Sequence, residues 1–246
     1  LITLFIMTVS IHADDTIRRV RVPILMYHYV SPLPDDADDI RRGLTVSPEM
    51  FRNHIRYLHS EGYSSISLYE MNQALIYGTQ LPSKPIIITF DDSYTDHYNY
   101  VFPVLQEFNF TGTFFVITDY TDNQNPNHMT WSQIQEMADA GMDMESHTKS
   151  HHTLINRDYD FLVWEILGSI ESIESNIGQR PDIFSYPVGK YDTATLDMLN
   201  TTSIISAVTT EYGTYHTLHN ALLSPRLRVT AEMGVNGLRN LLDTAP

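Results

Sequence analysis

Short apolar runs alternate with segments of helical periodicity along almost the whole chain. Residues 85–90 form the clearest run, whose continuous apolar character is typical of a strand buried on both faces of a parallel sheet. Residues 47–62 show the other pattern, with a Ser-Pro start, an apolar stripe at helical spacing and a terminal glycine. These signals predict a helix that begins at Pro48 and ends before Gly62.

Eight apolar runs predict strands, and seven periodic segments predict helices. The strands are expected at residues 22–27, 64–68, 85–90, 113–118, 142–146, 182–186, 204–208 and 222–229. The helices are expected at residues 48–61, 69–77, 98–105, 131–140, 159–177, 193–199 and 235–242. Strands that alternate with helices form βαβ units around a parallel sheet. Seven to eight units favour an α/β fold of the distorted (β/α) barrel type over an open doubly wound sheet. The sequence has no Gly-x-Gly-x-x-Gly segment after a predicted strand, so it gives no support to a dinucleotide-binding site.

The composition narrows the class of function. A chain of 246 residues with 42% hydrophobic content can bury one full core, so we expect a single catalytic domain at residues 14–246. The net charge of −15 argues against a basic surface for nucleic acid or for an anionic membrane. Because the chain has no cysteine, a zinc-like metal would need histidine and carboxylate ligands.

The first 13 residues form an apolar stretch that ends at Ala13. This stretch is shorter than the ~20 residues that a membrane-spanning helix needs, so we expect no stable membrane span. It is typical of the apolar region of a signal peptide, with Ala13 as the cleavage position, which predicts a secreted or cell-envelope protein. The alternative is an N-terminal segment that docks on the domain or frays.

Two polar motifs follow predicted strands: the pair Asp91-Asp92, and a segment that begins at His147 and ends at His151. In a (β/α) barrel the active site lies at the carboxyl ends of the strands, where both motifs would converge. Consecutive strand residues face opposite sides, so the two aspartates can share a site only where the strand turns into its loop. The four-residue separation of the histidines matches one helical turn if that loop begins helically.

These residue types suit a hydrolytic metal site. A zinc-like ion takes imidazole and carboxylate ligands and keeps one open position for water, a set that Asp92, His147 and His151 would complete. The remaining carboxylate, Asp91, is then a candidate general base for that water. Alternatively, the aspartates form a helix cap and a solvated turn, and the histidines lie in a polar surface loop. His152 is a second candidate ligand if the register shifts by one residue.

The chain resembles the NodB-like polysaccharide deacetylases of carbohydrate esterase family four. The resemblance rests on the Thr-Phe-Asp-Asp segment ending at Asp92, the His-Thr-Lys-Ser-His segment ending at His151, and shorter matches between residues 22 and 230. It implies a distorted (β/α) barrel that removes N-acetyl, or sometimes O-acetyl, groups from polysaccharides. It also implies that Asp91 is the base and that Asp92, His147 and His151 hold a divalent metal, Zn²⁺ first, with Co²⁺ or Ni²⁺ also accommodated.

The third family motif departs from its commonest form and resembles a subgroup with Tyr-Pro at this place. Ser185 and Val188 stand where many members have Arg and Tyr. Pro187 has no N–H, so the Val188 N–H is the expected donor to an oxyanion. The missing arginine, which steadies the base in the family, has a candidate substitute in Arg226, with Arg228 as the alternative. Either arginine could instead form a simple surface ion pair.

The remaining expectations concern the general acid and the side chains that contact the sugar. The family's late catalytic histidine has no clear match, because His216 and His219 lie in what reads as a loop. His28 follows the first strand and faces the same side of the barrel. The side chains expected to contact a sugar ring follow strand-end motifs and are Tyr94, Tyr186, Pro187 and Tyr191, together with Tyr29.

We therefore predict a metal-dependent hydrolase whose partner is an acetylated polysaccharide containing N-acetylglucosamine. One alternative is a pseudoenzyme that binds metal and carbohydrate without turnover, and another is an O-acetyl esterase on the same fold. A glycosidase is disfavoured, because its two carboxylates stand ~5 to 9.5 Å apart across the sugar, whereas Asp91 and Asp92 are adjacent.

Overall fold

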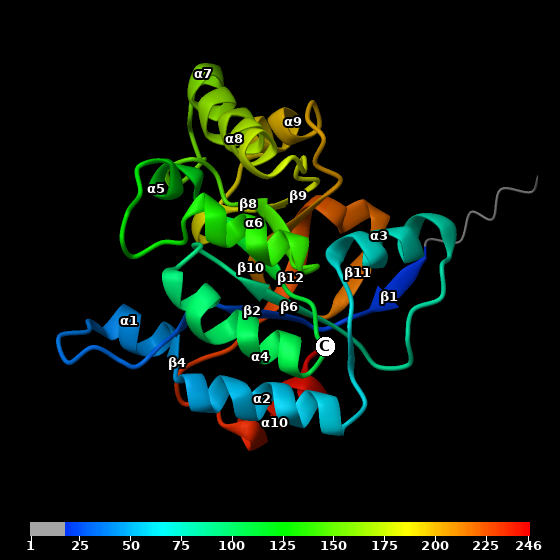
Figure 1. The fold of residues 1–246 in the computed structure, drawn as a ribbon. Coiled ribbons are helices and arrows are strands. Elements are labelled where there is room, and N and C mark those ends of the chain that lie inside the picture. Colours follow the sequence, from blue (N-terminus) through cyan, green and yellow to red (C-terminus); the bar gives the residue numbers. More distant parts are fainter. Residues whose placement is uncertain (1–17) are drawn as a thin grey trace, which may run out of the picture.

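The computed structural model describes residues 18–246. Seven parallel strands form a ring in the order β2-β12-β10-β9-β8-β7-β6, which closes through a pairing of β2 with β6, and β5 pairs with β6 outside the ring (Figure 1). The parallel strands are β2 (Ile24–Tyr27), β5 (Ser64–Ser65), β6 (Pro85–Phe90), β7 (Thr113–Val116), β8 (Asp143–Ser146), β9 (Ile183–Ser185), β10 (Ser206–Tyr212) and β12 (Ser224–Arg228). The distorted (β/α) barrel expected from the sequence is confirmed.

Helices follow most of the strands and pack outside the ring. They are α1 (Asp39–Leu44), α2 (Pro48–Ser60), α3 (Leu68–Tyr77), α4 (Phe102–Glu107), α5 (Thr118–Asp122), α6 (Trp131–Asp139), α7 (Tyr159–Leu162), α8 (Gly168–Ile177), α9 (Thr193–Leu199) and α10 (Val235–Thr244). Two π-helical turns, His97–Val101 before α4 and Val163–Leu167 between α7 and α8, interrupt helices that the sequence pattern predicts as regular. 3₁₀ turns lie at Pro187–Gly189 and Leu218–Leu223.

Three local predictions were wrong, and two of them concern where helices begin. The strand expected at 64–68 ends at Ser65, because Ser67 and Glu70 form a reciprocal capping box that starts α3 at Leu68. The run of Asp35, Asp36, Asp38 and Asp39 is predicted from its composition to be a solvated loop, but it leads into α1, whose first turn is capped by the Asp38 side chain.

Two pairs of short strands lie outside the ring. The pair β1 (Arg19–Arg21) and β11 (Tyr215–Thr217) is antiparallel, although residues 215–217 were expected to be loop. The pair β3 (Tyr29–Val30) and β4 (Thr45–Val46) is parallel and frames the segment that contains α1.

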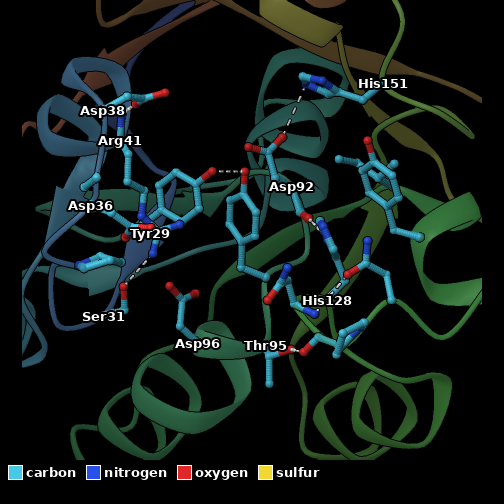
Figure 2. A pocket seen from close by; sticks show the side chains of 18 residues that line it. Tyr29, Ser31, Asp36, Asp38, Arg41, Asp92, Thr95, Asp96, His128 and His151 are labelled. Atoms are coloured by element: carbon cyan, nitrogen blue, oxygen red, sulfur yellow. Dashed lines mark hydrogen bonds and ion pairs between the residues drawn. The ribbon is translucent and has the colours of Figure 1, made fainter.

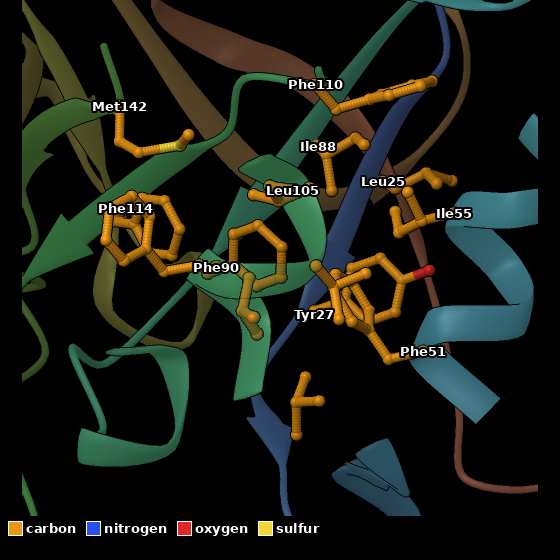
Figure 3. Close-up of a cluster of buried hydrophobic side chains, with 14 of the residues drawn as sticks. Leu25, Tyr27, Phe51, Ile55, Ile88, Phe90, Leu105, Phe110, Phe114 and Met142 are labelled. Atoms are coloured by element: carbon orange, nitrogen blue, oxygen red, sulfur yellow. The ribbon is translucent and has the colours of Figure 1, made fainter. Parts of the chain in front are cut away.

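The core next to the site is built on β6. Phe90 stacks between Phe114, with ring centroids 4.7 Å apart, and Tyr27, at 5.5 Å, and all three rings are buried (Figure 3). Fully burying one such ring contributes about 1.5–3 kcal/mol. Because side chains alternate along a strand, fixing Phe90 in this cluster directs Thr89 and Asp91 to the opposite side, where both meet Arg226.

The predicted signal segment, Leu1–Ala13, lies outside the described residues. Within residues 18–246, no helix is both long enough and apolar enough to cross a membrane.

Candidate active site

The carboxyl end of β6 brings both aspartates to the mouth of the barrel. Asp91 continues the strand, and its N–H donates to the carbonyl of Tyr27 on β2 at 3.0 Å. Asp92 and Ser93 then adopt left-handed backbone angles, with φ of 77° and 53°. Non-glycine residues rarely adopt such angles, and they recur where function requires a sharp change of direction. This turn lets two consecutive carboxylates face one site.

Asp92, His147 and His151 form the one cluster of potential metal ligands found within residues 18–246. One ligand atom from each residue lies within 4.8 Å of the others. Asp92 Oδ1 is 3.3 Å from Nε2 of His147 and 3.3 Å from Nε2 of His151, yet it is buried without a well-aligned hydrogen bond. Ligands on a tetrahedral zinc ion with bonds of about 2.0–2.1 Å lie about 3.3–3.4 Å apart, so the cluster fits such an ion.

The electrostatics of the two imidazoles differ. Burial lowers the pKa of His151 to about 4, helped by the neighbouring His147, so His151 is neutral at pH 7. Burial also disfavours the charged form of His147, but its contact with Asp92 and the charge of Asp91 outweigh burial and raise its pKa. The His147 Nδ1 atom is 2.8 Å from the carbonyl oxygen of Ser185. With Nδ1–H donating to that carbonyl, Nε2 is turned toward the cluster.

The segment between the histidines does not begin helically, so the condition under which their spacing would match one helical turn is not met. Thr148 and His151 have left-handed φ values of 67° and 61°, and Thr148 Oγ1 accepts a hydrogen bond from the His151 N–H at 3.0 Å. This turn, rather than a helical turn, accounts for the convergence of the imidazoles. The His152 side chain is 64% exposed and contacts Ser150, so in this structure His151, not His152, lies at the cluster.

Arg226, from β12, holds the second carboxylate. Its Nη1 and Nη2 atoms donate to Asp91 Oδ1 and Oδ2, both at 2.7 Å, in a fully buried two-bond pair. Nη2 also lies 3.3 Å from the hydroxyl of Ser185, whose small side chain leaves room for the guanidinium. Burial alone would raise the pKa of Asp91, but the charge and hydrogen bonds of Arg226 lower it to about 2. Asp91 is therefore ionised at neutral pH.

The turn after β9 has a strained backbone. Val188 has φ of 52°, which is unusual for a β-branched residue, and its side chain is exposed. Gly189 follows with φ of 69°, and a Cβ atom there would lie 2.2 Å from Thr210 Oγ1. The Gly189 N–H donates to the carbonyl of Tyr186 at 2.8 Å. Only glycine fits this position, and it fixes the course of the Val188 peptide.

The side chains of Tyr186 and Pro187 do not have the accessibility expected of sugar contacts. Tyr186 is 1% exposed, packs in a core cluster, and donates its hydroxyl proton to the carbonyl of Leu222. Pro187 is also buried. Tyr186 and Pro187 do follow strand β9, as the sequence predicts, but their side chains are buried and do not face solvent. Tyr191 lies against Tyr186, with ring centroids 5.1 Å apart, and remains partly exposed.

A cavity of about 710 Å³ opens beside Asp92 and His151 (Figure 2). Tyr94 lines it and stacks on Tyr29 with a centroid separation of 4.0 Å, while the Arg41 guanidinium carbon lies 3.2 Å from the Tyr29 ring centroid. Its other walls come from the loop after β3 and from residues 117–128. Sequence reasoning missed the wall residues that carry no motif, among them Arg41, Asp96, Tyr120 and His128.

His28, expected to line the cleft or to be a hydrogen-bonded structural histidine, lies near the site, whereas the two histidines considered for the acid role do not. Burial lowers the pKa of His28, opposed by the charges of Asp91 and Asp92, and its Nδ1 atom is buried without a hydrogen-bond partner among the described residues. His216 is on β11, where its Nε2 atom is 2.9 Å from the carbonyl oxygen of Val22. His219 lines a separate surface pocket.

Sequence comparison identifies the family. A model described as polysaccharide deacetylase matches residues 78–204, just over half of the chain. The Bacillus subtilis (strain 168) protein YxkH, classed as a polysaccharide deacetylase, is 32% identical over 217 residues, which cover 86% of this chain and 74% of that protein. The chain belongs to the polysaccharide deacetylase family, a family of hydrolases, as its motifs indicated.

Solved structures agree with the assignment. The Streptococcus pyogenes deacetylase PplD in complex with acetate matches with a TM-score of 0.84 and 28% identity, over 92% of this chain and 99% of that one. BC0361, a polysaccharide deacetylase from Bacillus cereus, matches with a TM-score of 0.79 and 25% identity, over 91% of this chain and 69% of that one.

One relative's name includes its substrate. The poly-beta-1,6-N-acetyl-D-glucosamine N-deacetylase of Escherichia coli (strain K12) is 28% identical over 132 residues, 48% of this chain and 20% of that protein.

Proposed function

We propose that this protein removes N-acetyl groups from a polysaccharide containing N-acetylglucosamine, using a divalent metal held by Asp92, His147 and His151. The observation that carries this proposal is the arrangement at the end of β6. An ionised carboxylate, Asp91, is fixed by Arg226 in the same barrel mouth as a convergent Asp-His-His cluster. A metal ligand set next to a separate, positioned base is the composition that amide hydrolysis by water requires.

The proposed chemistry divides between the metal and the chain. A bound divalent ion would make water more acidic and polarise the acetyl carbonyl. Asp91 accepts the proton of the attacking water, and Arg226 keeps that carboxylate ionised and oriented. The Val188 N–H donates to the oxygen that gains negative charge. Zn²⁺ suits the two-His, one-Asp set, and Co²⁺ and Ni²⁺ can be held by the same donors.

The cavity beside the cluster supports a neutral or cationic sugar polymer as the substrate. Its walls combine the stacked pair of Tyr29 and Tyr94, which Arg41 covers on the Tyr29 side, with the carboxylates of Asp36, Asp38 and Asp96, so aromatic surface lies beside hydrogen-bonding groups. The net charge of −15 disfavours a polyanionic ligand. The name of the Escherichia coli relative supports poly-β-1,6-N-acetylglucosamine as the first polymer to test.

One observation favours a second candidate, a chain that binds metal and glycan with little turnover. Neither His216 nor His219 reaches the cluster, so the expected source of a general acid is absent from those positions. This candidate predicts metal and glycan binding without acetate release, whereas an O-acetyl esterase would release acetate only from O-acetylated polymers.

Two variants separate the proposed roles. Asp91→Asn should retain Zn²⁺ binding but lose at least about 100-fold in acetate release, the scale of general-base catalysis. Asp92→Asn should lose both Zn²⁺ binding and acetate release. Each variant is compared with wild type by chelator competition and by an acetate assay on N-acetylated and O-acetylated polymers. Wild-type turnover by Asp91→Asn would show that the assigned base is wrong.

We also propose that the protein acts outside the cytoplasm, supported by the apolar stretch that ends at Ala13. Fractionation of cells expressing the full coding sequence, followed by detection of the chain in the envelope or medium, tests this proposal. Retention in the cytoplasm would contradict it.

A further inference from the structure

A buried glutamate outside the barrel mouth contacts the turn that joins the two histidine ligands. Glu165 lies in the π-helical turn Val163–Leu167 and is 0% exposed. In the described part of the chain, its one ion-pair neighbour within 4 Å is the exposed His152, whose Nδ1 is 3.8 Å from Oε1. A buried carboxylate without a close cation is unfavourable unless hydrogen bonds satisfy its oxygens.

The hydrogen bonds to Glu165 come from Lys149 and Ser150, two of the three residues between His147 and His151. Oε2 accepts from the Ser150 N–H at 3.0 Å, and Oε1 accepts from the Ser150 hydroxyl. The main-chain carbonyl of Glu165 accepts from the Lys149 N–H at 3.1 Å. One residue of the helix thus accepts three donors from two consecutive residues of the turn.

His151 depends on this turn more than His147 does. His147 follows β8, its N–H donates to Val116, and its ring contacts Ser185. His151 lies in no helix or strand, its backbone is left-handed, and its side chain is 29% exposed. The position of its imidazole beside Asp92 therefore depends on the conformation of the segment before it.

We propose that Glu165 is a positioning residue for the metal cluster, which fixes the Lys149-Ser150 turn so that His151 faces Asp92. This inference rests on the metal site of the proposed function. The π-helical turn is consistent with the role, because single π turns inside helices are rare and are frequently found at functional sites. Residues that hold metal ligands from behind typically change metal affinity 10-fold to 100-fold when they are replaced.

The test is the Zn²⁺ dissociation constant of folded protein, measured by competition with a chromogenic chelator. Glu165→Gln keeps the size of the side chain but offers one oxygen to two Ser150 donors, so we expect affinity to fall about 10-fold to 100-fold. Ser150→Ala removes only the hydroxyl donor and should weaken binding less, in the same direction. The matched control is Glu171→Gln on the exposed face of α8, which should bind Zn²⁺ as wild type does.

The outcomes separate positioning from general stability and from the metal proposal itself. A merely structural glutamate would lower the unfolding temperature of the metal-free protein and leave the Zn²⁺ affinity and the visible spectrum of bound Co²⁺ unchanged. That result for Glu165→Gln would overturn the inference while leaving the metal cluster intact. If Glu165→Gln does not fold, the Zn²⁺ affinity of Ser150→Ala is the test. A Zn²⁺ affinity equal to that of wild type in Ser150→Ala would then overturn the inference. Absence of Zn²⁺ binding by wild type would overturn the metal cluster and the inference together.

Discussion

At the scale of single residues, the central contact is the pair between Asp91 and Arg226. The two side chains come from strands that are 135 positions apart in the sequence, and Ser185 occupies the place where a bulkier side chain would compete for the same space. Sequence motifs could nominate Arg226 as a candidate, because it belongs to a late strand of the barrel. They could not select it over Arg228, since that choice depends on which face of β12 points inward.

Replacing Arg226 should change the pH dependence of catalysis. In Arg226→Lys one point charge replaces the two-bond fork, so Asp91 loses part of its stabilisation while its burial, which raises the pKa, remains. We expect the pKa of Asp91 to rise, which protonates the base at higher pH, and kcat/KM to fall about 10-fold or more at neutral pH.

The measurement is the pH profile of kcat/KM, in which the acidic limb should move to higher pH in Arg226→Lys. Arg56→Lys, on the exposed surface of α2, is the control and should leave the profile unchanged. An acidic limb that stays in place in Arg226→Lys would contradict the assignment of Arg226 to the base.

At the scale of elements, the sequence predicted best where one hydrophobic pattern determines the structure. The continuous run at 85–90 corresponds to β6, and the periodic segment at 193–199 corresponds to α9. The turns that shape the site were not predicted, because a left-handed residue such as Val188 or His151 leaves no hydrophobic pattern. The π-helical turn at Val163–Leu167 was missed for the same reason, since one extra residue barely disturbs an apolar stripe.

The turn after β9 offers a direct test of this element-scale account. Gly189→Ala must accept both a left-handed backbone and a Cβ atom 2.2 Å from Thr210 Oγ1. The left-handed backbone costs an alanine about 1–2 kcal/mol, and the overlap should add roughly 1–3 kcal/mol. Because the change also displaces the Val188 peptide, acetate release should fall in the protein that remains folded.

The matched control is Gly178→Ala at the end of α8, where φ is 71° and no atom lies within 4 Å of the added Cβ. It should show the backbone cost alone and retain wild-type activity. Thermal unfolding and acetate release are measured for both variants. Equal destabilisation by the two substitutions would contradict the role assigned to the contact with Thr210.

At the scale of the whole molecule, the barrel follows from the alternation of strands and helices, and the position of the site follows from the barrel. The pattern does not predict the cavity, because its walls come from the loop after β3, from α1 and from residues 117–128, where most of the lining residues carry no motif. The fold also brings half-buried acids together on β8 and at the start of β9. Glu145 accepts hydrogen bonds from the N–H groups of Asp182 and Ile183, and Asp143 lies nearby.

Ionisation of Asp143 in this acidic group should oppose folding more at neutral pH than at mildly acidic pH. Burial, followed by the charges of Asp182 and Glu70, raises the pKa of Asp143 to about 6, against the hydrogen bond from Thr113, which lowers it. A carboxyl group whose pKa is higher in the folded than in the unfolded state opposes folding above pH 6, and this penalty disappears as the pH falls toward 4. Asp143→Asn should therefore raise the unfolding temperature at pH 7.5, and raise it less at pH 4.5.

Thermal unfolding at the two pH values measures this effect, with Asp197→Asn, on the exposed surface of α9, as the control. The control should show no gain at pH 7.5. If Asp143→Asn is no more stable than wild type at pH 7.5, the ionised Asp143 carboxylate does not oppose folding and the account of this group is wrong.

The central claim is that the Asp-His-His cluster holds the metal that makes this chain a deacetylase. The most direct measurement is acetate release from N-acetylated poly-β-1,6-glucosamine and chitin oligomers by chelator-treated protein, before and after stepwise addition of Zn²⁺, Co²⁺ or Ni²⁺. We expect no release from the metal-free protein and full recovery near one equivalent of metal. Undiminished release without metal, or no release with any of these ions, would contradict the account.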